Sequence, residues 1–197
     1  MMNLKIMIPI VFLTIISNRD FNKTGGYFNS DPEIVHIVLT DDGIFPNNPL
    51  PVILYKAVID FSQGGDAVVI EKIFQKNSWG NSWRNGIYGF HHYHSTAHEV
   101  LGVYSGSAKV RLGGEKGEIF DIQKGDVVLI PAGVAHKNLE SSSDFRVVGA
   151  YPAGQFWDMN YGKEGERPEA DQNISKVLLP VTDPVFGEKG PVKELWK

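Results

Sequence analysis

Four of the six histidines in the chain fall between residues 91 and 98, and this stretch holds the residues best suited to chemistry. On an extended backbone alternate side chains share a face, so His92 and His94 point one way and His91 points the other. Glu99 follows His94 by five residues, which leaves room for a short turn to return its carboxylate to the same point. Imidazoles and a carboxylate that converge in this way are ligands for Fe, Mn, Ni, Cu or Zn.

A second segment, residues 125 to 136, supplies one more imidazole. An apolar run leads into Pro131 and Gly133, which predict a strand that ends in a rigid turn and projects His136. Cysteine is absent from the chain, so thiolate ligands and disulfides are excluded and nitrogen and oxygen atoms must hold any metal. The candidate ligand set is therefore His92, His94, Glu99 and His136.

Short extended segments with glycine-rich punctuation surround these residues. Such regular spacing predicts an antiparallel sandwich or barrel. The segments are residues 86–94, 99–106, 108–114, 118–122, 123–133 and 145–151. After Tyr151 the chain reads as loop, with a helical turn expected over residues 170–176, and we expect this tail to wrap the outside of the barrel.

The part of the chain before residue 80 predicts fewer regular elements. Residues 34–39 form a β-branched run and predict a strand, and the turn-rich residues 41–51 predict a long loop. Residues 66–76 predict a helix, because Asp66 can cap it and Val69, Ile70, Ile73 and Phe74 recur at helical spacing.

The N-terminus can carry targeting information. Lys5 is followed by an apolar run, residues 6–16, whose length suits the core of a signal peptide and falls short of the roughly 20 residues that a transmembrane helix needs. We therefore expect residues 1–31 to be an apolar segment and linker, and residues 32–197 to form a single domain. Export is favoured, although no small-residue cleavage motif follows the run. The alternative is an N-terminal strand or helix that lies on the barrel of a cytoplasmic protein.

The overall charge argues against a nucleic-acid partner. The formal net charge is -4 at pH 7, and lysines and arginines form no long run. Proteins that bind nucleic acid need a cluster of positive charge to neutralise phosphates. A small-molecule ligand is the expected partner.

The two histidine segments resemble the paired motifs of the cupin superfamily, G-x5-H-x-H-x3-4-E-x6-G and G-x5-P-x-G-x2-H-x3-N. The matching positions are Gly86, His92, His94, Glu99 and Gly106 in the first motif, and Gly125, Pro131, Gly133 and His136 in the second. The final asparagine position of the second motif holds Glu140 instead, with Asn138 two residues early. This position is not a metal ligand in the family. From about His36 to Trp196 the chain is similar to small YjlB-like cupins.

The resemblance implies an all-β cupin fold, a double-stranded β-helix or jelly-roll barrel with a few short peripheral helices. It also implies one divalent metal held by His92, His94, Glu99 and His136, and a homodimer, since cupins often pair barrels to cover exposed sheet edges.

Two functions remain open from the sequence. The first is a metal-dependent enzyme of dioxygenase, oxidase or isomerase type that acts on a small organic acid or sugar-like molecule. Four protein ligands leave about two positions on a six-coordinate metal for such a molecule, and Glu99 is the candidate catalytic residue, as a proton acceptor. The alternative is a non-catalytic module that binds a small molecule or stores metal.

Overall fold

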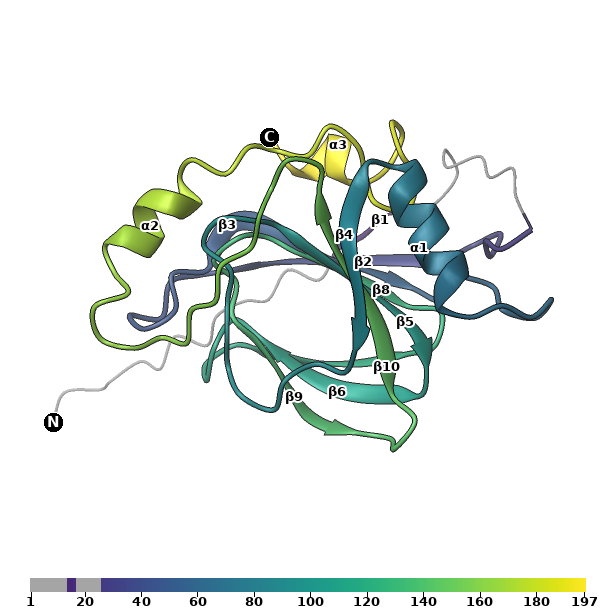
Figure 1. Ribbon diagram of the computed structural model, residues 1–197, viewed down its shortest axis with the longest axis horizontal. Helices are drawn as coiled ribbons and strands as arrows, with labels where there is room; N and C mark the ends of the chain where they lie inside the picture. The colour runs from purple at the N-terminus through teal and green to yellow at the C-terminus, as the bar shows by residue number, and fades with distance from the viewer. Residues whose placement is uncertain (1–13, 17–25) are drawn as a thin grey trace, which may run out of the picture.

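The computed structural model describes residues 14–16 and 26–197, and its architecture is two antiparallel sheets that face each other (Figure 1). The larger sheet has seven strands in the order β1-β2-β3-β8-β5-β10-β4, and the smaller has three in the order β7-β6-β9. The strands are β1 (Thr14–Ile16), β2 (Glu33–Leu39), β3 (Asn48–Lys56), β4 (Trp79–Asn85), β5 (Glu99–Ser105), β6 (Ser107–Leu112), β7 (Glu118–Gln123), β8 (Val127–Ile130), β9 (His136–Ser141) and β10 (Arg146–Pro152). The all-β cupin fold that the sequence predicted is confirmed.

One hydrophobic core fills the space between the two sheets. Strand β6 alternates exposed and buried residues, so Ala108, Val110 and Leu112 face inward, as a half-buried antiparallel strand requires. They pack against residues of the larger sheet that include Leu101 and Val147. This packing holds the two sheets together as a barrel.

A second core covers the outer face of the larger sheet. Helix α1 (Ala67–Lys76) and the C-terminal segment, drawn in yellow, lie across this face (Figure 1). Successive residues of β5 therefore enter different cores, since Val100 joins the outer core and Leu101 the inner one. The two cores bury the central strands on both sides, which makes the larger sheet a rigid platform.

Helix α1 begins where the sequence predicts. The side chain of Asp66 accepts a hydrogen bond of 2.9 Å from the backbone N–H of Val68, and so caps the helix. Ile70 and Phe74 then pack directly on Gly102 of β5, where an added Cβ would lie 2.6 Å from a methyl carbon of Ile70. The short helices α2 (Glu169–Ile174) and α3 (Val192–Leu195) lie in the C-terminal tail, and none of the described helices has the length and apolar character to cross a bilayer.

Two expectations about the strands were wrong, and strands β4 and β9 were not predicted. Residues 86–94 are not a strand, because within this segment only His92 and Tyr93 form isolated bridges. The loop predicted over residues 41–51 ends earlier, since β3 begins at Asn48. Strand β4 was not predicted, because it lies at the edge of the sheet and most of its residues are exposed or half-buried, which leaves no apolar alternation to read.

The N-terminal segment is described only at β1. Strand β1 pairs with β2, with Thr14 opposite His36, so this short piece extends the larger sheet. Residues 1–13 and 17–25 lie outside the described residues. The predicted signal peptide falls mostly on them, and export therefore stays a prediction.

Candidate metal site

The backbone around the histidines is tied together at one end of the barrel. The N–H of His92 donates to the carbonyl of His136 at 3.2 Å, and the N–H of His136 donates back at 2.9 Å. The N–H of Gly133 donates to the carbonyl of His94 at 2.7 Å. The segment after β4 belongs to no sheet, but these backbone hydrogen bonds hold it against the turn between β8 and β9.

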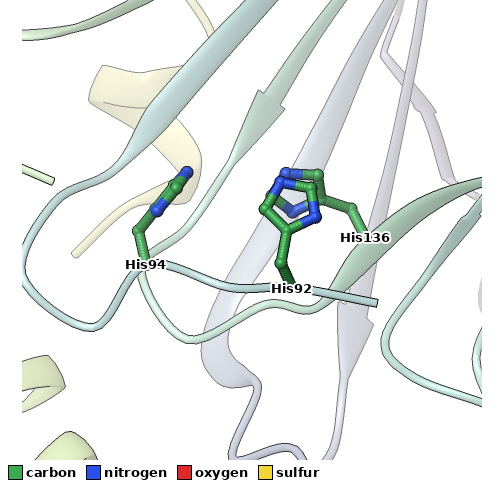
Figure 2. Close-up of side chains that lie close together, drawn as sticks. All are labelled: His92, His94 and His136. Atoms are coloured by element: carbon green, nitrogen blue, oxygen red, sulfur yellow. The ribbon is translucent and has the colours of Figure 1, made fainter. Parts of the chain in front are cut away.

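The three predicted histidine ligands meet at this point, and Glu99 lies beside two of them. Figure 2 shows the rings of His92, His94 and His136 turned toward a common space, and one ring nitrogen from each lies within 4.8 Å of the others. The Oε2 atom of Glu99 lies 3.4 Å from His94 Nε2 and 3.2 Å from His136 Nε2. Glu99 opens strand β5 and is only 2 % exposed, and the three histidines are buried as well.

Backbone carbonyls set the orientation of each imidazole. Nδ1 of His92 lies 3.3 Å from the carbonyl of Phe90, Nδ1 of His136 lies 3.2 Å from that of Val134, and Nδ1 of His94 contacts that of Asp158. A carbonyl can only accept, so each Nδ1 carries a proton, and a ring in its neutral form then presents its Nε2 lone pair. This is the tautomer that a metal bound at Nε2 requires.

The electrostatics of the cluster favour a cation at its centre. Burial, reinforced by the neighbouring His136, lowers the pKa of His92 to about 3, so this ring stays neutral. Burial opposes ionisation of Glu99, but His94 and His136 outweigh it and lower the pKa of the carboxyl, so the carboxylate is charged. Among the described residues no hydrogen bond of good geometry reaches its Oε2 atom, although Nε2 of His94 and of His136 lie within 3.4 Å of it.

Nitrogen lone pairs and a carboxylate oxygen in such proximity repel one another unless a positive charge lies between them. The donor set and the Oε2 atom, which no hydrogen bond of good geometry reaches from the described residues, therefore fit a divalent metal.

Two supporting residues escaped the sequence reasoning. Tyr151 of β10 is buried, and its hydroxyl donates to Glu99 Oε1 at 2.9 Å. Asp158 accepts from the N–H of Ser95 at 2.6 Å through its side chain, while its carbonyl orients His94. Neither residue lies in a recognisable motif, since each acts on a ligand more than 50 positions away in the chain.

Trp83 holds the Tyr151 hydroxyl that contacts Glu99. Its Nε1–H donates to the hydroxyl of Tyr151 at 2.9 Å, so the bonds run in sequence from indole to phenol to carboxylate. The indole lies against Gly149 of β10, where an added Cβ would come within 2.2 Å of two ring carbons. A glycine at this position is what permits the indole to reach Tyr151.

The four candidate metal ligands line a cavity of about 230 Å³. Tyr88, Trp157, Ile87, Leu101 and Met159 contribute to its walls. Four aromatic residues near the site are strongly exposed, and two of them, Tyr88 and Trp157, line the cavity; the other two are Phe90 and Phe156.

The remaining two histidines of the first segment lie elsewhere. His91 turns away, as predicted, and its Nε2 lies 3.1 Å from Glu115 Oε1. His98 is buried. Its Nδ1 accepts from the N–H of Ala132 at 3.0 Å, and the centre of its ring lies 4.6 Å from that of Trp196.

Several solved structures share limited similarity with the chain. An acireductone dioxygenase from Bacillus anthracis, with a cadmium ion in its active centre, is 18% identical over 51% of this chain and 64% of its own, with a TM-score of 0.36. The oxalate decarboxylase of Bacillus subtilis, which has Mn(II) centres, is 15% identical over 70% of this chain and 30% of its own, with a TM-score of 0.31. Similarity this low does not bear on activity.

Sequence comparison is more informative. The family model described as Cupin matches residues 81–150, which include all four candidate ligands. The protein named "Uncharacterized protein YjlB" from Bacillus subtilis is 43% identical over 157 residues, which cover 79% of this chain and 92% of that protein. The chain therefore belongs to the cupin family and is a homologue of YjlB.

Proposed function

We propose that the protein is a metal-dependent enzyme that holds one divalent metal with His92, His94, Glu99 and His136 and acts on a small oxygen-containing molecule in the adjoining cavity. The single observation that carries the proposal is the convergence of three Nε2-presenting imidazoles and the Oε2 atom of Glu99 at a buried point. Fe, Mn, Ni, Cu and Zn all accept such a donor set.

A bound metal at this point would supply Lewis-acid chemistry or a site for O2. The residues of the chain supply the rest. The aromatic and aliphatic walls exclude water. The three backbone carbonyl contacts fix the orientation of the imidazole rings, and Tyr151 restrains Glu99. Glu99 is also the proposed proton acceptor. Its lowered pKa makes it a weak base while His94 and His136 lie beside it, so it accepts a proton only if it moves away from them.

The alternative function is a non-catalytic module that binds a small molecule or stores metal. One observation favours it, because the hydroxyl of Tyr151, a titratable group in contact with Glu99, is already engaged with Glu99 and Trp83. A typical acid-base enzyme would aim a second titratable group at its substrate.

A turnover screen with single metals separates the two. The metal-free protein is reconstituted with each of the five metals and mixed with a panel of small organic acids, enols and sugars under air and under nitrogen, and products are followed by NMR. The enzyme proposal predicts turnover with at least one metal, lost in His94→Ala and kept in His91→Ala. Retention of a ligand without any conversion would support the non-catalytic module.

A further inference from the structure

Two exposed aromatic rings stand over the metal site. The Trp157 ring lies 5.7 Å from that of His94 and stacks on Tyr151 at 6.1 Å, while the Tyr88 ring meets that of His92 edge-on at 5.2 Å. Both line the cavity, yet Trp157 is 49 % exposed and Tyr88 is 48 % exposed. Each ring is thus fixed beside a ligand histidine and still leaves apolar surface open to an occupant of the cavity.

The charges around the cavity are sparse. Among the described residues that line it, the one permanently cationic side chain is Arg84, whose guanidinium makes two hydrogen bonds of 2.7 Å to the carboxylate of Glu71. Among the same described residues, Glu99 is the one carboxylate. A divalent metal beside Glu99 would leave one net positive charge, which matches a single negative charge on the occupant.

We infer that the cavity selects a monoanionic molecule that binds the metal through a pair of oxygen atoms and rests a flat apolar group against Trp157 and Tyr88. This inference rests on the proposed metal centre and narrows its substrate class. Aromatic walls favour planar groups, because stacked and edge-on rings attract one another beyond the effect of buried area.

The same walls disfavour the two other substrate types. A sugar needs a hydrogen-bond partner for most of its hydroxyls, and buried hydroxyls without partners are costly. Much of the wall is apolar, formed by residues such as Ile87, Leu101 and Met159. A small dianion needs a second free cation, but Arg84 is already paired with Glu71.

The test uses two hydroxamates that share one metal-binding head. Benzohydroxamate carries a phenyl ring, acetohydroxamate carries a methyl group, and both bind through two oxygens as monoanions. Each hydroxamate is titrated into the full chain loaded with Co(II), whose visible absorption reports coordination directly. The affinity of each hydroxamate for the protein is then divided by its affinity for free Co(II), which corrects for the intrinsic strength of the metal-binding group. The titrations are repeated with Trp157→Ala, with Tyr88→Ala, and with Phe156→Ala as a matched control, since Phe156 is exposed but does not line the cavity.

We expect wild type to prefer benzohydroxamate by about tenfold after this correction, since ring stacking and burial typically contribute that much. The preference should shrink in both wall variants and persist in the control. Equal corrected affinities in wild type, or a preference that survives both wall substitutions, would overturn the inference while the Co(II) spectrum still supports the metal centre. Absence of Co(II) binding would overturn the inference and the proposed function together.

Discussion

Replacing Tyr151 with phenylalanine removes a single oxygen atom, one that contacts the candidate metal ligand Glu99. That oxygen donates to Glu99 Oε1 and accepts from Trp83 Nε1, each at 2.9 Å. Burial, and then the Glu99 carboxylate, raise the pKa of Tyr151, so the hydroxyl stays protonated and donating at neutral pH. Because Tyr151 is only 2 % exposed, water has little access to replace the lost group.

The magnitude follows from the two lost bonds. A hydrogen bond to a charged acceptor contributes about 1.5–3 kcal/mol and a neutral one about 1 kcal/mol. We therefore expect Tyr151→Phe to lower the free energy of unfolding of the metal-free protein by about 2.5–4 kcal/mol. Because outer partners restrain metal ligands, we also expect affinity for a divalent metal to fall by about 10–100-fold.

Urea denaturation and a competition titration with a chromophoric chelator measure the two effects. Tyr161→Phe is the matched control, since Tyr161 lies on the surface at 40 % exposure and should change neither quantity. If Tyr151→Phe left stability within about 0.5 kcal/mol of wild type, the range of neutral surface changes, and left affinity unaltered, the role assigned to this hydroxyl would be refuted.

Three further predictions concern the candidate metal site and the residues around it. Gly149→Ala should destabilise the protein by about 1–3 kcal/mol, because the new methyl group collides with the Trp83 indole. Thermal unfolding measures this, with Gly80→Ala as the control, since a Cβ at Gly80 meets nothing within 4 Å. Equal losses of stability in the two variants would contradict the prediction. Asp158→Ala should weaken metal binding by about tenfold, because it loosens the segment that orients His94. Calorimetric titration measures this, and an unchanged metal affinity would contradict the role assigned to Asp158. Burial opposes protonation of His94, but the Glu99 carboxylate outweighs it and raises the pKa of the ring. Metal must displace that proton, so below this pKa affinity should fall about tenfold per pH unit, and a pH-independent affinity between pH 6 and 7 would contradict the assigned ligand.

Local spacing was sufficient to predict the candidate ligands. His92 and His94 were placed on one face from the alternation of an extended chain, and they do converge although residues 86–94 form no strand. The reason is the paired backbone bonds between His92 and His136, which keep that short stretch extended. The alternation rule needs only two or three extended residues, not a full strand.

Long-range contacts were beyond the reach of the sequence. Tyr151 is separated from Glu99 by 52 positions, and Asp158 is separated from His94 by 64. Nothing in the local pattern of either residue marks it as a partner of a ligand, since strand β10 reads as ordinary core and the segment after it as loop.

Element boundaries failed where the chain is either polar or dense in turn residues. Strand β4 reads as loop because the sheet edge leaves most of its side chains exposed or half-buried, and β3 begins inside a run of asparagine and proline. Helix α1 was predicted well because its Asp66 cap and its buried stripe are both local signals.

The most direct test of the central claim is the metal content of the purified protein, without added metal, measured by elemental analysis. Wild type should carry close to one equivalent of Fe, Mn, Ni, Cu or Zn, His136→Ala should carry little, and His91→Ala should match wild type because its side chain turns away from the site. Circular dichroism would establish that the variants are folded. Equal metal content in wild type and His136→Ala, or no metal in wild type even after reconstitution, would contradict the assigned site.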